Sequence, residues 1–230
     1  MSRVFTVSKM NAISFETSRC RDGYRIVLRP PGKKGGRRPY YLVATSDRFE
    51  RLAPLDNFPA LFAILADTPA NPEGLRKFAD NFGLLDSGTA TNATKQSVPN
   101  MLHHQWVLKR ALAAFEKEDN HELMRLLAEG KKEGSHSSLT ITLPGAAVGL
   151  AQVELRMEAG NKLEAVIVPS SLIQAIWTQF LLHAASNAQL LRCEHCAKPF
   201  VVGSGTNRRS TAKYCSNACK VAAFKARQEA

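Results

Sequence analysis

The sequence predicts an α+β fold that ends in a small module built around four cysteines. A β-hairpin pattern between residues 24 and 45, and helical spacing of apolar residues after Phe58, predict a mixed main domain. Four of the five cysteines lie in residues 191–230, which predicts a separate metal-binding module. We therefore expect a main domain over residues 1–190, with an N-terminal β-hairpin and several helices, followed by this module.

The predicted hairpin consists of two β-rich segments, residues 24–29 and 40–45, separated by a turn rich in Pro and Gly. The basic residues of this turn are Lys33, Lys34, Arg37 and Arg38. The turn lacks the Gly-Lys-Ser/Thr ending of a nucleotide-binding P-loop. Two interpretations of the four residues stay open: a phosphate-binding element, or a solvated hairpin tip.

Helices are expected in the middle of the chain, where apolar residues recur with helical spacing. Pro72 and Gly83 mark the expected start and end of the second helix. Residues 84–100 are rich in Ser, Thr, Asn and Gly, which predicts a loop. A long helical segment follows over residues 101–130, broken near Asp119.

Three short β-rich runs come next, and a strongly apolar helix follows them. The runs cover residues 139–143, 153–157 and 163–168, and Gly160 and Asn161 predict a turn between the last two. The helix begins near Ser171 and is apolar over much of its circumference. We expect this helix to be buried in the main domain and to lead into the cysteine module.

The composition is that of an ordinary globular protein, with 44% apolar and 22% charged residues. The N-terminal residues lack the charged start and apolar run of a secretory signal, and no stretch approaches the roughly 20 apolar residues that span a bilayer. The distribution of the five cysteines does not suggest a disulfide scaffold, which fits a reducing compartment. We expect a cytoplasmic protein without a membrane partner.

The net charge of +11 is concentrated at the two ends of the chain. Residues 1–58 carry 12 Lys and Arg against 5 Asp and Glu (+7), and residues 192–230 carry 8 against 2 (+6). The residues between them carry 11 against 13 (−2). Because Lys and Arg neutralise phosphates, this asymmetry favours a polyanionic partner, nucleic acid first. The alternative is that the charge serves solubility.

The spacing of the four C-terminal cysteines is typical of a structural zinc site. Cys193 and Cys196 form a Cys-x-x-Cys pair, and 18 residues separate it from the second pair, Cys215 and Cys219. Four thiolates can surround Zn²⁺ tetrahedrally at about 2.3 Å, which leaves no coordination position for water or substrate. We therefore expect a structural Zn²⁺ bound by all four cysteines, with His195 unbound.

The flanking residues predict a treble-clef-like zinc finger. Residues 200–202 are expected to form a strand, and residues 212–214 its return strand. A helix over residues 217–228 is expected to begin at the second cysteine pair, where its positive end stabilises thiolates. The module has too few apolar residues to fold without metal.

The motif resembles the C-terminal zinc finger of bacterial CGNR-type proteins. The matching residues are Cys193, Cys196, Phe200, Arg208, Arg209, Tyr214, Cys215, Ser216, Cys219, Lys220 and Arg227. The Gly-Asn-Arg sequence that gives the family its name is absent after Cys219. The module also resembles a sister group of bacterial proteins that carry a Tyr-Cys-Ser-x-x-Cys tail. The family is thought to regulate transcription, and the resemblance therefore implies DNA binding through the finger.

The basic residues of the module give a chemical basis for DNA binding. They are Arg208, Arg209, Lys213, Lys220, Lys225 and Arg227. On the predicted last helix Lys220, Phe224 and Arg227 share one face, and such a helix can lie in a major groove. The alternative is that Val221 and Phe224, with Ala222, pack against the zinc core while the charges are solvated.

Catalysis is not expected from this sequence. The first 190 residues contain no nucleophile elbow, paired-carboxylate signature or dinucleotide fingerprint. The finger lacks the histidine pair with which treble-clef nucleases bind a second metal. We expect a DNA-binding regulatory protein. The alternative is a protein-interaction protein, in which the zinc finger is a stabilising cap and the main domain recognises another protein or a small ligand.

Overall fold

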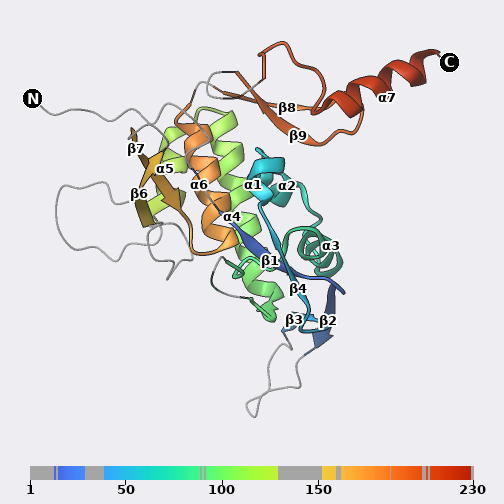
Figure 1. Cartoon of the computed structure of the whole chain (residues 1–230), viewed down its shortest axis with the longest axis vertical. Coiled ribbons are helices and arrows are strands. Elements are labelled where there is room, and N and C mark those ends of the chain that lie inside the picture. Colours follow the sequence, from blue (N-terminus) through green and yellow to red (C-terminus); the bar gives the residue numbers. More distant parts are fainter. Residues whose placement is uncertain are drawn as a thin grey trace, which may run out of the picture.

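Helices and small antiparallel sheets are mixed along the chain, which confirms the α+β class (Figure 1). The computed structural model describes residues 13, 15–28, 39–88, 90, 92–128, 152–158, 162–186, 188–203, 206 and 208–228. The strands are β1 (Thr17–Cys20), β2 (Tyr24–Leu28), β3 (Tyr40–Ala44), β4 (Phe49–Leu52), β5 (Lys95–Ser97), β6 (Gln152–Glu158), β7 (Lys162–Val168), β8 (Gln189–Arg192) and β9 (Pro199–Val202). The helices are α1 (Pro54–Asn57), α2 (Leu61–Asp67), α3 (Pro72–Phe82), α4 (Val98–Glu116), α5 (Asn120–Ala128), α6 (Leu172–Ala184) and α7 (Asn217–Gln228).

The predicted N-terminal hairpin is confirmed as β2 and β3, which pair with Tyr24 opposite Ala44 and Leu28 opposite Tyr40. β5 extends this hairpin into a three-stranded antiparallel sheet by pairing with β3. β1 pairs with β4 in a separate two-stranded sheet. The sequence pattern does not indicate β1, β4 or β5, which have only three or four residues each.

The helix α3 packs against β1 and β2, and both of its ends match the sequence signals. At its start, the side chain of Asn71 accepts a hydrogen bond from the backbone N–H of Gly74 at 2.8 Å. At its end, Gly83 has φ +89°, and a Cβ atom there would lie 2.3 Å from the carbonyl oxygen of Ser18 in β1. Glycine therefore permits both the turn and the close approach of the two elements.

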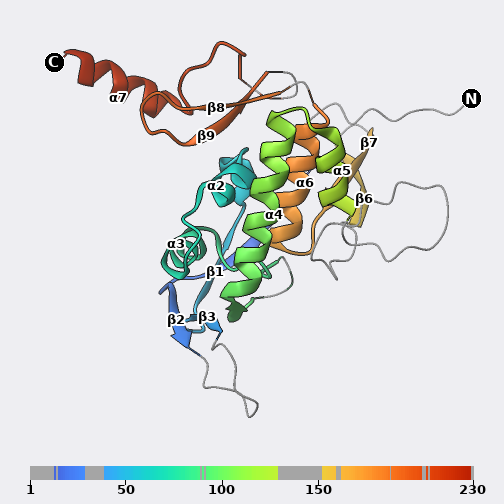
Figure 2. The same ribbon diagram turned by 180° about the vertical axis from the view of Figure 1, so that it is seen from behind.

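The helices α2, α4 and α6 form the centre of the main domain (Figure 2), where α2 packs against both others. The side chains of Phe62, Trp177 and Phe180 are fully buried, and the rings of Phe62 and Phe180 lie 5.7 Å apart. Gln179 links α6 to α2: its Nε2 donates to the carbonyl oxygen of Phe58 at 2.9 Å, and its Oε1 accepts from the N–H of Phe62 at 3.3 Å. The apolar helix near the end of the main domain is thus buried, as predicted.

The predicted loop over residues 84–100 is wrong in its last part, because β5 begins at Lys95 and α4 begins at Val98. The residues before β5 are also tied into the core. The N–H of Leu85 donates to the Oε1 of Gln96 at 2.7 Å, and its carbonyl oxygen accepts from the N–H of Ile173 at 2.9 Å. Polar composition alone did not reveal this segment, because the buried Gln96 is tied to the backbone of Leu85 instead of being solvated.

The structure also describes the predicted helix break and two of the three predicted β-rich runs. The predicted break near Asp119 is confirmed, since α4 ends at Glu116 and α5 begins at Asn120. The two strands around the predicted turn are confirmed as the antiparallel pair β6 and β7. The strand expected over residues 139–143 lies outside the described residues. Within the described part of the chain, no helix has the length and apolar character needed to cross a membrane.

The hairpin of β8 and β9 joins the C-terminal module to the main domain. Leu190 and Val201 lie opposite each other and pack with the main-domain core. The neighbouring pair, Leu191 and Phe200, packs with the cysteines instead. Because successive side chains of a strand point to opposite faces, one hairpin serves both clusters. The domain boundary expected at residue 190 falls inside β8 and stays a prediction.

The burial of His104 and His183 makes the stability of the fold depend on pH. Burial lowers the pKa of His183, and burial together with the charge of His103 lowers the pKa of His104 from 6.5 to about 4. The unfolded chain therefore binds more protons than the folded chain between pH 6.5 and about 4. We predict that His104 lowers the free energy of unfolding by about 3 kcal/mol as the pH falls through this window, measured by urea denaturation.

Two variants isolate the contribution of His104. His104→Leu removes the titrating group and is expected to make the free energy of unfolding less dependent on pH across the same window. His103→Gln changes the exposed neighbour and is expected to keep most of the wild-type dependence. Identical pH dependence in the wild type and in His104→Leu would contradict the prediction.

Candidate metal centre and basic cleft

The four cysteines predicted as ligands form one cluster, with all four sulfur atoms within 4.8 Å of one another. The Sγ of Cys215 lies 3.5 Å from that of Cys196 and 3.4 Å from that of Cys219. A disulfide needs about 2.0 Å. Four thiolates at about 2.3 Å from one ion lie about 3.8 Å apart, close to the observed spacing. The cluster can therefore hold a metal ion.

Each cysteine pair is positioned by local backbone structure. After β8, the N–H of Cys193 donates to the carbonyl oxygen of Lys198 at 3.0 Å, and Ala197 turns the chain with φ +57°. At the start of α7, the Oγ of Ser216 accepts from the N–H of Cys219 at 3.2 Å and caps the helix. A turn thus presents the first pair, and a capped helix start presents the second.

The thiols of Cys193 and Cys215 have different pKa values because their surroundings differ. Burial and the neighbouring cysteine thiols, Cys219 first, raise the pKa of Cys215 to about 12. Burial also opposes ionisation of Cys193, but backbone N–H groups, that of Cys196 first, lower its pKa to about 6. Four thiolates repel one another unless a cation lies between them, so metal binding and thiol ionisation are coupled.

The predicted return strand over residues 212–214 is wrong. The described residues 212–214 form no strand, and β9 pairs instead with β8, which precedes the first cysteine pair. β8 has an apolar side chain on each face, Leu190 and Leu191, and this allows it to pack on both sides. A backbone hydrogen bond of 3.0 Å from Glu194 to Lys213 connects the 212–214 segment to the first cysteine turn. The treble-clef shape stays a prediction.

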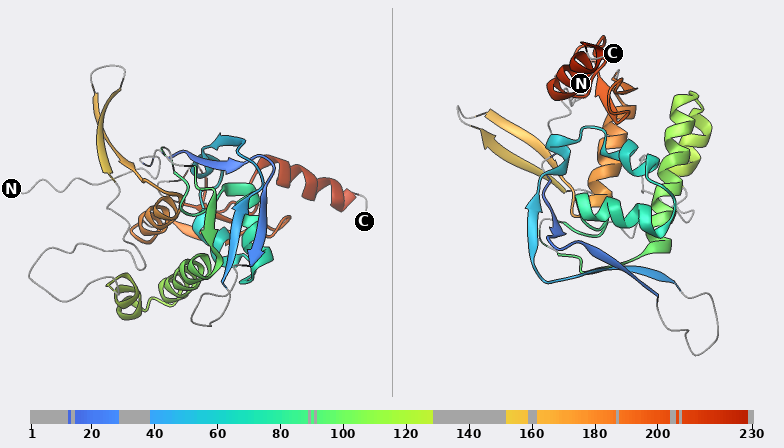
Figure 3. Two further views of the ribbon diagram at one scale, coloured as in Figure 1. Left: turned by 90° about the horizontal axis from the view of Figure 1, so that it is seen from below. Right: turned by 90° about the vertical axis from the view of Figure 1, so that its right-hand side faces the viewer.

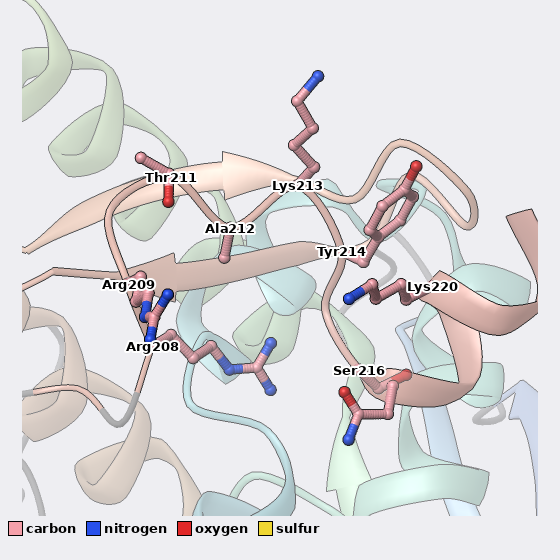
Figure 4. A pocket seen from close by; sticks show the side chains of 9 residues that line it. Arg208, Arg209, Thr211, Ala212, Lys213, Tyr214, Ser216 and Lys220 are labelled. Atoms are coloured by element: carbon pink, nitrogen blue, oxygen red, sulfur yellow. The ribbon is translucent and has the colours of Figure 1, made fainter. Parts of the chain in front are cut away.

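A cleft with a volume of about 670 Å³ lies beside the second cysteine pair, lined with basic residues (Figure 4). We call it the basic cleft. Its lining residues are Arg208, Arg209, Thr211, Ala212, Lys213, Tyr214, Ser216, Asn217 and Lys220. Four of them belong to the predicted nucleic-acid-binding set, and no carboxylate is among these described residues. Figure 4 shows Arg208 and Arg209 on one side, facing Tyr214 and Lys220 on the other.

Two of the four cations in the basic cleft have partners within the module. The Nζ of Lys213 lies 3.2 Å from the carboxylate of Glu194, and in Figure 4 its side chain points away from the other lining residues. The guanidinium of Arg208 lies over the ring of Phe200, 5.5 Å from its centre. Phe200 is buried beside the cysteines, so this contact places the arginine at the edge of the cysteine cluster.

The helix α7 extends away from the rest of the described chain (Figures 1 and 3), and none of its residues is buried. Val221 and Phe224 have exposed fractions of 53% and 61%. The alternative in which these two side chains pack on the zinc core is therefore wrong, although Ala222 is half-buried. Arg227 donates a hydrogen bond to the hydroxyl of Tyr214, which connects α7 to the basic cleft.

The remaining predicted residues lie outside the cluster and the basic cleft. Lys225 is exposed on α7, and His195 is exposed and not part of the sulfur cluster. The basic residues of the hairpin turn, which lie outside the described residues, are Lys33, Lys34, Arg37 and Arg38.

An ion pair that the sequence does not indicate links the module to the main domain. The guanidinium of Arg192 donates to both carboxylate oxygens of Asp67, the last residue of α2, at 2.8 and 3.0 Å. The two residues are 125 positions apart, and no local pattern connects them. The only sign of this contact in the sequence is Arg192 itself, a basic residue directly before Cys193.

Metal content tests the cluster directly. We predict that the purified protein holds about one metal ion per chain, and that Cys215→Ser loses it because only three sulfur ligands remain. Elemental analysis of the desalted protein measures this. Cys20→Ser is the matched control, since Cys20 is buried in β1 and its Sγ lies 3.5 Å from the Oγ of Ser46, outside the cluster. Full metal content in Cys215→Ser, or loss of metal in Cys20→Ser, would contradict the assignment.

No family model, no curated protein and no solved structure matches this chain. The resemblance to CGNR-type zinc fingers therefore stays a prediction. The cysteine cluster, the basic cleft and the exposed α7 are the features from which a function follows.

Proposed function

We propose that this protein binds double-stranded DNA through its C-terminal module and acts as a regulatory protein rather than as an enzyme. The basic cleft carries the proposal, because it places Arg208, Arg209 and Lys220 around one opening of about 670 Å³ without a carboxylate among its lining residues. Phosphate groups are the natural partners of such a site, since their neutralisation by Lys and Arg supplies most of nonspecific DNA affinity.

We assign Zn²⁺ to the four-cysteine cluster, because four thiolates are the donor set typical of structural zinc. A closed coordination shell leaves no position for a substrate, so the role of the ion is to hold the module together. Cys215 and Cys219 flank Ser216 and Asn217, which line the basic cleft. The shape of this side of the cleft therefore depends on the metal cluster.

The polar groups of the basic cleft support phosphate contacts as well. Thr211 and Ser216 add hydroxyl groups, and Tyr214 adds a phenol. Hydroxyl groups together with Lys and Arg make most of the contacts between proteins and the DNA backbone. The charge distribution agrees, since residues 192–230 carry 8 Lys and Arg and only 2 Asp and Glu.

A protein partner is the competing function, and the exposed side chains of Val221 and Phe224 favour it. An exposed apolar patch often marks a surface that binds another protein. On α7, however, these side chains lie among Lys220, Lys225 and Arg227, and the helix contains no Asp or Glu. This charge favours a polyanion over a typical protein surface.

A salt series tests DNA binding. We expect the metal-loaded protein to bind random-sequence duplex DNA with an affinity that falls steeply with salt concentration. The variant with Arg208, Arg209 and Lys220 changed to Ala is expected to bind more weakly. The slope of its log affinity against log salt should be smaller by about 0.9 for each lost phosphate contact. Fluorescence anisotropy of a labelled duplex measures both quantities.

A second triple variant controls for net charge. Arg25, Lys77 and Lys109 are exposed residues of the main domain, and changing them to Ala removes the same three positive charges. We expect this variant to keep the wild-type slope. If both triple variants lose the same affinity and slope, the DNA is attracted by the overall charge rather than by the basic cleft. If the wild type does not bind DNA, the protein-interaction alternative is favoured.

A further inference from the structure

One face of α7 is covered by nothing in the described chain. Its residues follow one another at intervals of four, three and four positions, which places them in one line along the helix. They are Asn217, Val221, Phe224 and Gln228, and all four are exposed. The opposite face holds the half-buried residues Cys219, Ala222 and Ala223. We call the exposed line the outward face of α7.

The dimensions of the outward face suit the major groove of DNA. A helix is about 10–12 Å wide, and the major groove is about 12 Å wide. At 1.5 Å per residue, the line from Asn217 to Gln228 is about 16 Å long, which corresponds to about five base pairs. α7 also extends away from the rest of the described chain, so a duplex can reach it (Figure 3).

Positive charges flank the outward face on both sides. Lys220 and Arg227 lie along one side of it and Lys225 along the other, by helical periodicity. Lys220 also lines the basic cleft, so the outward face is continuous with the proposed phosphate site. A second copy of this chain packed on the same face would bring like charges together, whereas DNA phosphates compensate them.

The side chains in the centre of the outward face match one class of base pair. In the major groove, Asn or Gln can bind the N6 and N7 of adenine together, and apolar groups contact the methyl group of thymine. Guanine is matched mainly by Arg or Lys and cytosine by Glu or Asp. The central line of α7 contains amide and apolar side chains only.

We infer that α7 recognises A·T base pairs in the major groove. Asn217 and Gln228 bind adenine edges, and Val221 and Phe224 contact thymine methyl groups. The inference rests on the proposed DNA binding and adds the class of sequence that is bound. It also gives the exposed Phe224 a partner that a purely electrostatic site does not provide.

Replacing thymine by uracil tests the inference, because it removes only the methyl group. Affinities are measured by fluorescence anisotropy for three duplexes of one length: A·T-rich, G·C-rich, and the A·T-rich sequence with uracil. We expect the wild type to bind the A·T-rich duplex most tightly. Uracil should weaken binding about four-fold for each methyl group that is covered, the equivalent of exposing one buried CH₂ group.

Two variants connect the effect to α7. Phe224→Ala is expected to lose affinity for the thymine duplex and to respond less to uracil than the wild type does. Trp106→Ala is the matched control, because Trp106 is an aromatic residue on α4 with an exposed fraction of 50%. This variant should behave like the wild type.

The outcomes separate the inference from the proposed function. Salt-dependent binding of equal strength to all three duplexes would overturn the inference and leave the proposed function standing. A preference for A·T that survives uracil, Phe224→Ala and the replacement of both Asn217 and Gln228 by Ala would also overturn it, since such a preference comes from the minor groove or from DNA shape. If Trp106→Ala and Phe224→Ala lose the same affinity for the thymine duplex, the role of α7 is overturned. Absence of salt-dependent binding to every duplex would overturn both.

Discussion

Repulsion among four crowded thiolates is the constraint on which the C-terminal module depends. Their sulfur atoms lie within 4.8 Å of one another, too close for all of them to be ionised without a cation between them. Few apolar residues are available to hold the module together instead: Phe200 and Val202 are the buried ones beside Cys193 in this cluster. We therefore propose that metal coordination, rather than packing, joins the two cysteine pairs.

The shape of the surface proposed to bind DNA depends on that junction. Arg208 lies over Phe200 on one side of the cluster, and Lys220 lies one residue after Cys219 on the other. The basic cleft between them exists only while both sides are held in place. The shared hairpin of β8 and β9 joins this surface to the main domain by packing on both cores, and the exposed Arg192–Asp67 ion pair adds a second contact. α7 points outward (Figure 1).

Local patterns predicted the parts of the structure that local chemistry determines. Cysteine spacing identified the cluster that can hold a metal ion, and the turn residues and apolar period around Pro72 identified α3, because each signal lies within one continuous segment of the chain. The pairing of β9 with β8 depends on two separate cores that share one hairpin, which no single segment reveals. The Arg192–Asp67 contact and the exposure of Phe224 depend on tertiary placement in the same way.

Amide hydrogen exchange, measured with and without a metal chelator, tests most directly whether the metal organises the functional surface. We predict that chelation removes protection from α7 and from residues 193–203 and 208–216. Protection in α6, whose Trp177 and Phe180 belong to the main core, should persist. Unchanged protection of α7 after complete removal of the metal would contradict the account, because the helix would then be held by something other than the cysteine cluster.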